Sequence, residues 1–186
     1  GDPGFESNGA ADYGQAVWEA VYESGRRFDV TPYGTEAMHV LRAEKGYIIV
    51  GQETDGTVTP DDLGLGGLVG KAKRDFVGKR SLVRPDVVAT GRKQLVGLRT
   101  GDLSLILDEG AQIVADPNQA VPMKMIGHVT SSYMSANIGR SIALALVVDG
   151  RRRMNERLHV TTPTGFAQAT VVEPVFLDPE GVRLHA

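Results

Sequence analysis

Glu44 is the residue whose type and position in this chain most directly suggest ligand chemistry. The run from Pro32 to Gly46 has the apolar spacing of a helix, and Glu44 falls in its last turn. A carboxylate there faces the negative end of the helix dipole, an unfavourable placement of about 0.3–1 kcal/mol. Two interpretations are open. Glu44 is a solvated side chain paired with a neighbouring base, or it is held there to bind a ligand.

A basic cluster of Lys71, Lys73 and Arg74 follows a glycine-rich stretch. Runs of this kind usually form a solvated face. The alternative is that one of the three holds an anionic end of a ligand through charge-assisted hydrogen bonds. The preceding glycines do not form a phosphate loop, because Leu65 stands where a Walker-type loop needs Gly and Ala72 where it needs Ser or Thr.

Metal and thiol chemistry lack their usual residues. The sequence has no cysteine, which excludes a disulfide framework, a thiol nucleophile and a cysteine–zinc site. Its histidines are far apart and form no ligand-spaced pair: they are His39, His128, His159 and His185. We therefore expect no metal site.

Composition limits the class of protein. The 186 residues could form one large or two small domains, and we expect two. A net charge of −3 gives no electrostatic basis for nucleic acid or an anionic membrane as the main partner. The sequence shows no signal peptide and no apolar run near the roughly 20 residues that span a bilayer, which is compatible with a cytoplasmic location. The chain begins without Met in turn-forming residues, so we expect a fragment.

Two helices are expected to position the first half. Apolar residues recur at helical spacing over 13–24, and Trp18 lies off the centre of that stripe. This position predicts a partly buried packing residue, and the alternative is a residue that stacks on a ligand. Thr31 is the expected cap of the second helix, with Pro32 in its first turn and Gly46 at its end. Beyond it we expect a buried strand over 47–50.

The segment that leads to the basic cluster has turn and capping chemistry. Asp55 and Gly56 predict a tight turn. Residues 59–62 combine a capping Thr, a Pro and two acids, which predicts a short helix start.

The second half has the character of a small β-structure. Residues 83–91 are a predicted linker. Six short runs rich in Val, Ile, Leu and Thr then alternate with Gly, Pro and Asp turns: they are 94–99, 112–115, 126–130, 142–148, 157–162 and 166–172. Their spacing predicts an antiparallel barrel, with Pro122 and Pro174 outside its central strands.

Two polar stretches of this half have more than one interpretation. The hydroxyl residues of 127–133 are expected to satisfy backbone groups in a tight loop between strands. The alternative is a loop packed over a ligand site or against a partner subunit. Residues 151–153 are three arginines after a turn, and they are predicted to be a solvated hairpin tip.

A family resemblance rests on longer runs of sequence. One resemblance is to the second half of the tetrahydrofolate-binding fold of glycine-cleavage aminomethyltransferases. It is carried by the run LRAEKGYIIVGQETDGTVTPDDLGLG, followed by KRDFVGKRSL. A second resemblance is to the C-terminal part of sarcosine oxidase alpha subunits. It is carried by the run TPYGTEAMHVLRAEKGYIIVGQETDGTVTPDDLG. The family's G-x-VTS motif resembles GHVTSSY. The resemblance extends over nearly the whole chain from Tyr13 onward.

The resemblance implies an α+β fold. Residues 1–88 would be the C-terminal half of a folate-binding, aminomethyltransferase-like α/β domain, and residues 92–186 the family's β-barrel. Glu44 would hydrogen-bond the pterin ring of tetrahydrofolate, and a basic residue among Lys71, Lys73 and Arg74 would contact the tail carboxylates. The family's catalytic Asp falls outside this chain, so no catalytic residue is expected here.

The resemblance also implies an activity. The intact enzyme would oxidise sarcosine at a flavin on another subunit and pass the one-carbon unit to tetrahydrofolate, yielding 5,10-methylenetetrahydrofolate, glycine and peroxide. The partners would be the other subunits of a hetero-oligomer, with NAD, FAD and FMN bound elsewhere, and this piece alone would be inactive. The alternatives are an aminomethyltransferase, a dimethylglycine-dehydrogenase-type domain, or a non-catalytic folate-binding or assembly module.

Three departures from the family pattern stand in the first half. The GE-x-x-F/Y-E strand is represented only by residues 1–6, followed by Ser-Asn-Gly where apolar residues are expected. Gly67 stands where an aromatic residue is common, and Val50 lies near the place of a frequent Tyr.

Overall fold

The computed structural model describes residues 4–70 and 72–185. The helices are α1 (Gly14–Gly25), α2 (Thr35–Glu44) and α3 (Pro85–Val88). The strands are β1 (Lys93–Thr100), β2 (Gln112–Val114), β3 (Gly127–Ser135), β4 (Arg140–Val148), β5 (Arg157–Thr162) and β6 (Gly165–Val172). Short 3-10 helices are η1 (Ala11–Tyr13), η2 (Arg26–Phe28), η3 (Gly66–Leu68), η4 (Lys79–Val83), η5 (Gly150–Arg153) and η6 (Val182–His185). No helix in these ranges is both long and apolar enough to cross a bilayer.

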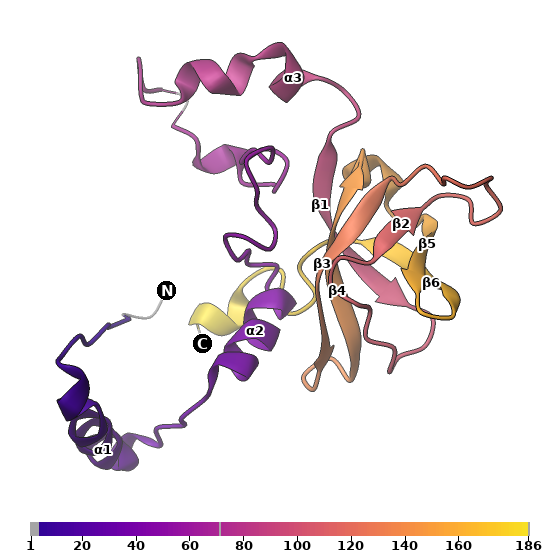
Figure 1. Ribbon diagram of the computed structural model, residues 1–186. Helices are drawn as coiled ribbons and strands as arrows, with labels where there is room; N and C mark the ends of the chain where they lie inside the picture. Colours follow the sequence, from indigo (N-terminus) through magenta and orange to yellow (C-terminus); the bar gives the residue numbers. More distant parts are fainter. Residues whose placement is uncertain (1–3, 71, 186) are drawn as a thin grey trace.

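The six strands close into an antiparallel barrel in the order β1-β4-β3-β2-β5-β6 (Figure 1). All six runs that the sequence predicted as strands are strands in the structure. The expected loop over 127–133 is wrong, because β3 continues to Ser135 and pairs with β4 along its length. A register shift between Val129 and Ser131 lets the hydroxyl-rich part stay in the ladder.

Strand β4 separates two hydrophobic clusters. Ala143, Ala145 and Val147 face the barrel interior, which they share with residues such as Leu158 and Val171. The alternate residues of β4 pack outside the barrel in a second cluster, which contains Ala43, Leu63, Leu95, Ile142, Leu144, Leu146 and Phe176. Burial on both faces explains why this strand is an unbroken apolar run rather than an alternating one.

The two predicted helices form, but their details differ from the expectation. Helix α2 begins at Thr35 with Gly34 at its N-cap, so the predicted start at Thr31 and Pro32 is wrong. Its end is as predicted, because Gly46 takes a left-handed φ of 68°. Figure 1 shows α2 beside the barrel, whereas α1 lies apart from it. Trp18 is 58 % exposed, so the prediction that it is a partly buried packing residue is also wrong.

Residues 47–65 form turns rather than helices or strands. The strand predicted over 47–50 is wrong, since only an isolated bridge joins Val50 to Thr54 in this described segment. At the predicted helix start, Thr59 and Asp62 do exchange capping hydrogen bonds. The helix does not propagate, because Gly64 two residues later has a φ of 78°.

Candidate functional site

Glu44 is buried at the seam between α2 and the barrel. Only 1 % of this residue is exposed. Its Oε1 accepts a 2.6 Å hydrogen bond from Ser135 Oγ at the end of β3, and its Oε2 accepts a 2.9 Å bond from Asn137 Nδ2 in the next turn. The interpretation of Glu44 as a solvated side chain is therefore wrong. Two donors from the barrel offset its unfavourable position at the helix terminus.

A second buried carboxylate lies on the same side of the barrel. Arg42 Nη1 forms a 2.8 Å ion pair with Glu53, whose exposed fraction is zero. Ser131 Oγ of β3 accepts a 2.6 Å bond from Arg42 Nη2 and donates a 2.5 Å bond to Glu53 Oε1. The backbone N–H of Ile49 completes the set with a 2.8 Å bond to Glu53 Oε2. Removing one partner of such a buried pair typically costs about 3–5 kcal/mol.

Sequence reasoning missed Glu53 as a member of this site. The only signal was an acid placed a few residues after the apolar run 47–50, on a chain whose preceding helix carries Arg42. That signal does not predict the ion pair between Arg42 and Glu53. The hydroxyl that bridges the two side chains belongs to Ser131, which is far away in sequence.

The C-terminal segment fixes the same helix end from another side. The backbone N–H groups of Phe176 and Leu177 donate to the carbonyl oxygen of Glu44 at 2.8 and 3.0 Å. Lys45 Nζ donates to the carbonyl oxygen of Asp178 at 2.6 Å. These bonds satisfy a carbonyl group that an isolated helix would leave open. The last turn of α2 is thus held by the barrel and by the segment that follows it.

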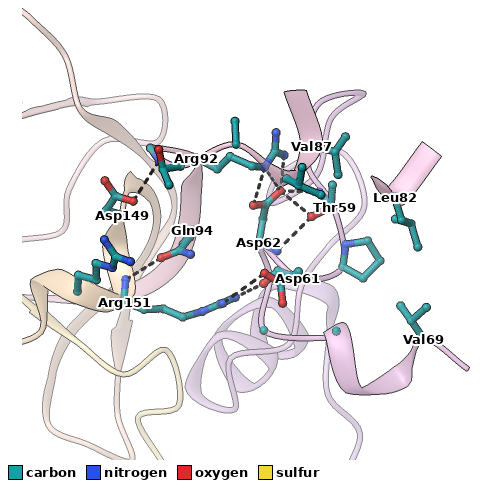
Figure 2. A pocket seen from close by; sticks show the side chains of 18 of the residues that line it. Thr59, Asp61, Asp62, Val69, Leu82, Val87, Arg92, Gln94, Asp149 and Arg151 are labelled. Atoms are coloured by element: carbon teal, nitrogen blue, oxygen red, sulfur yellow. Dashed lines mark hydrogen bonds and ion pairs between the residues drawn. The ribbon is translucent and has the colours of Figure 1, made fainter. Parts of the chain in front are cut away.

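A cavity of about 700 Å³ opens between the first half of the chain and the barrel (Figure 2). Val69, Leu82 and Val87 form an apolar wall on one side of it, and Gln94 and Arg151 lie on the opposite side. Small-molecule sites commonly have this combination of apolar lining and a few polar groups, with volumes of roughly 300–1,000 Å³. The cavity therefore has one apolar side and one polar side.

An ion pair between Asp62 and Arg92 anchors the rim of this cavity. Arg92 Nε donates a 3.0 Å bond to Asp62 Oδ1, and the backbone N–H and hydroxyl of Thr59 both donate to Oδ2 at 2.8 Å. Burial alone would raise the pKa of Asp62, but the hydrogen bonds from Arg92 and Thr59 outweigh it and hold the pKa below its ordinary value. The pKa of Arg92 is raised, chiefly by its hydrogen bond to Asp62. Both groups stay charged at neutral pH.

The arginines after β4 were predicted to be a solvated tip, and this is confirmed for exposure at Arg151 and Arg152, whereas Arg153 is partly buried. Arg151 reaches across the cavity to the first half of the chain, where Nη1 lies 3.7 Å from Asp61 Oδ2 and Nη2 donates to the Asp61 carbonyl oxygen. Arg153 turns back and donates to the carbonyl oxygen of Val148 at 2.9 Å. Arg152 is exposed and lines the cavity.

The basic cluster is set apart from Glu44. Lys73 lines a smaller hollow of about 380 Å³ whose walls include Leu68 and Phe76. Lys79 Nζ donates to the carbonyl oxygens of Lys73 and Arg74 at 2.7 and 2.8 Å, which shapes this loop.

The hollow adjoins the main cavity, because both are lined by Pro60, Val69 and Leu82. Of the predicted ligand residues, Lys71 lies outside the described residues. Among the described residues that line these two openings, Glu44 is absent. The structure therefore does not place Glu44 in the hollow that Lys73 lines.

The chain is similar to known proteins along most of its length. Residues 1–73 match the GCVT N-terminal domain, and residues 93–178 match the Glycine cleavage T-protein C-terminal barrel domain. The sarcosine oxidase subunit alpha of Corynebacterium sp. (strain P-1) is 50 % identical over 92 % of this chain, and that of Rhizobium meliloti (strain 1021) is 39 % identical over 100 %. An aminomethyltransferase of Clostridium botulinum (strain Okra / Type B1) is 30 % identical over 95 %.

A solved structure shows the same fold. The glycine cleavage system aminomethyltransferase T from Bartonella henselae aligns with a TM-score of 0.73 at 20 % identity, over 90 % of this chain and 45 % of that chain. This structure and the closed barrel confirm the predicted fold class, and the two domain matches confirm the predicted family. The chain spans 18–19 % of the length of the two sarcosine oxidase subunits and 46 % of the aminomethyltransferase.

Proposed function

This chain belongs to the glycine cleavage T-protein family, and from that premise we propose that it is the C-terminal, folate-binding part of a sarcosine oxidase alpha subunit. The observation that carries the proposal is the 50 % identity to a subunit of that name over 92 % of this chain. The whole enzyme would oxidise the N-methyl group of sarcosine and transfer the one-carbon unit to tetrahydrofolate. The boundary between the two domains would lie within residues 89–91.

The residues present are compatible with a folate. A folate has a pteridine ring at one end and tail carboxylates at the other, so its two binding groups need not share one cavity. The hollow beside Lys73 combines an ammonium group with apolar walls, including Phe76, and suits an aromatic ring that carries a carboxylate tail. Lys73, Arg74 and Lys71 are the proposed tail ligands.

Glu44 is the proposed ligand of the pteridine ring, by exchange of one hydrogen-bond donor. Asn137 is exposed, whereas Ser135 is buried within the barrel seam. The amide of Asn137 can therefore swing away while Ser135 keeps Glu44 in place. The pteridine's amino and ring N–H groups would then replace Asn137 Nδ2 as donors to Glu44 Oε2. A carboxylate can accept such a pair of hydrogen bonds.

The chain's contribution to the chemistry would be orientation and exclusion of water. Bound tetrahydrofolate supplies the nucleophilic amines that capture the one-carbon unit. The rigid seam between α2 and the barrel would hold the pteridine at a fixed angle, which replaces a bimolecular encounter in water. In the same proposal, this chain assembles with the other subunits of the oxidase, and NAD, FAD and FMN bind to other parts of the enzyme.

An aminomethyltransferase is the second candidate, since the Clostridium botulinum enzyme is 30 % identical over 95 % of this chain. Activity separates the two functions. With the complete protein, formation of peroxide from sarcosine supports the oxidase, whereas folate-dependent release of ammonia from an aminomethylated carrier without peroxide supports the transferase.

Calorimetric titration of tetrahydrofolate into the complete protein tests the folate site itself. We expect Glu44→Ala to weaken binding at least tenfold and Lys73→Ala to weaken it less, because one group of a basic cluster is removed. Lys93→Ala is the matched control on an exposed lysine outside both openings. Unchanged affinity in Glu44→Ala would remove Glu44 from the site.

A further inference from the structure

Strand β6 extends past the end of its neighbour β1 at one end of the barrel. Strand β5 pairs with β6 as far as Gly165, the first residue of β6. Strand β1 pairs with β6 only as far as Ala169, which lies opposite Thr100 at the end of β1. Residues 165–168 of β6 therefore have a ladder partner on one side only.

The open side of this segment presents backbone groups of Phe166 and Gln168. The N–H of Val171 donates to the carbonyl oxygen of Glu156 at 2.9 Å, on the side of β5. Because this direction alternates along an antiparallel strand, Phe166 and Gln168 direct their N–H and C=O groups to the other side, where β1 has ended. No described residue bonds to these groups there. An open edge of this kind is a template for another extended chain.

A hollow of about 510 Å³ lies directly beside this edge. It is lined by Phe166 and Gln168 from β6 and by Leu105 from the loop that follows β1. Phe166 is 38 % exposed, although its ring also packs edge-on against His159. When a peptide adds to a sheet as a strand, backbone hydrogen bonds supply affinity and pockets for alternate side chains supply specificity. The edge and the hollow together offer both.

Asp102 sets the charge of this hollow, because it is the only charged residue among the described residues that line it. Its Oδ1 accepts bonds from the backbone N–H and the hydroxyl of Ser104, both at 2.8 Å. These bonds hold the pKa of Asp102 below its ordinary value, so the carboxylate is charged at neutral pH. The same edge of a second copy would bring another carboxylate and no base. A different polypeptide with a basic residue has the complementary charge.

We propose that residues 165–168 of β6 bind a short extended segment of another polypeptide, which adds as a strand beside Phe166 and Gln168. Apolar side chains at alternate positions of that segment would enter the hollow, and a Lys or Arg would lie next to Asp102. The β5–β6 hairpin lies on the side of the barrel away from α2, so this helix does not cover the edge (Figure 1). The inference is independent of folate binding.

Amide hydrogen exchange, measured by NMR on the full chain, tests the open edge first. We expect the amides of Phe166 and Gln168 to exchange at least tenfold faster than that of Ala167, which faces β5. The probe for the partner is an acetylated and amidated peptide of alternating valine and threonine with a lysine at each end. At saturation it should slow exchange of the Phe166 and Gln168 amides at least fivefold. The same peptide with alternate amides N-methylated should have no effect, because it cannot donate to the edge.

Variants and a charge-reversed peptide locate the contact. Gln168→Pro removes an N–H on the open side and leaves the hydrogen bonds to β5 in place, so it should weaken peptide binding at least fivefold. Phe166→Ala, which removes the aromatic wall, should weaken binding to a similar extent, and circular dichroism checks that both variants fold. Replacing the two lysines of the peptide by glutamate should weaken binding at least threefold, and Asp102→Asn should abolish this difference. Asp116→Asn is the matched control, since Asp116 also caps its own turn but does not line the hollow.

Other outcomes would overturn the proposal. Slow exchange of the Phe166 and Gln168 amides in the free chain at every concentration would show that the chain itself covers the edge. Slow exchange that appears only at high concentration of the chain would make a second copy the occupant. Absence of peptide binding at millimolar concentrations, or resonance shifts confined to residues away from the hollow, would leave the edge without this role. None of these readouts involves folate, so they are separate from failure of the proposed function.

Discussion

The carboxylate of Glu44 accepts a 2.6 Å hydrogen bond from the hydroxyl of Ser135, a residue 91 positions further along the chain. This bond joins the last turn of a helix in the first half to the end of a barrel strand. The two matched domains therefore share a buried polar contact as well as the apolar cluster around β4. The acid that the sequence marks as a ligand is at the same time part of the domain seam.

Ser135→Ala should destabilise the protein. The substitution removes one donor from a carboxylate that has almost no contact with water, and an unsatisfied buried group costs about 1–3 kcal/mol. Urea unfolding measures the loss. Ser104→Ala is the matched control, because Ser104 is exposed and bonds only within its own turn in the described structure. Equal stability of both variants would contradict the importance of the seam contact.

Asn137→Ala separates the two roles of Glu44. If a pteridine replaces Asn137 at Glu44 Oε2, then removing the amide abolishes a competitor, and tetrahydrofolate affinity of the complete protein should stay equal or increase. Glu44→Gln should lower it, since an amide oxygen accepts less well than a carboxylate and its NH₂ group opposes the ligand's donors. Titration calorimetry gives both values. Loss of affinity in Asn137→Ala would rule out the exchange of donors.

The pair formed by Arg42 and Glu53 should show strong coupling. Arg42→Met alone leaves Glu53 buried without its counter-charge and is expected to cost about 3–5 kcal/mol. The double variant Arg42→Met with Glu53→Leu should lose less than the sum of the single losses, because no uncompensated charge is left. A double-mutant cycle from chemical denaturation gives the coupling energy. Additive losses would show that the two side chains act independently.

Asp62 should make the protein sensitive to acid. Its pKa is held below the ordinary value of 3.8 in the folded state, so folding gains stability above that value and loses it as the pH falls through the lower, folded-state pKa. Asp62→Asn should reduce the slope of unfolding free energy against pH in this acidic window. Asp61→Asn, a neighbouring carboxylate that is 80 % exposed, should change the slope much less. Denaturant titrations between pH 2 and pH 6 measure both.

Local pattern was sufficient for much of this architecture. The six barrel strands were predicted because alternation of β-branched runs with Gly, Pro and Asp is a short-range property. Gly46 ended the second helix as expected, since a left-handed residue is favourable only for Gly among its neighbours. Glu44 stood out as an acid at the unfavourable end of a helix, and the motif around it was enough to indicate the family.

Only the tertiary structure decided which groups meet. The partners of Glu44 and of Glu53 come from β3, and the register of a distant strand leaves no trace in the local sequence of α2. The prediction that Trp18 is partly buried is wrong, because helical periodicity indicates which face of a helix is apolar but not what covers that face. The capping pair of Thr59 and Asp62 failed to start a helix because a glycine in the left-handed region overrides a favourable N-terminus. Burial and pairing depend on the closure of the barrel, a property of the whole fold.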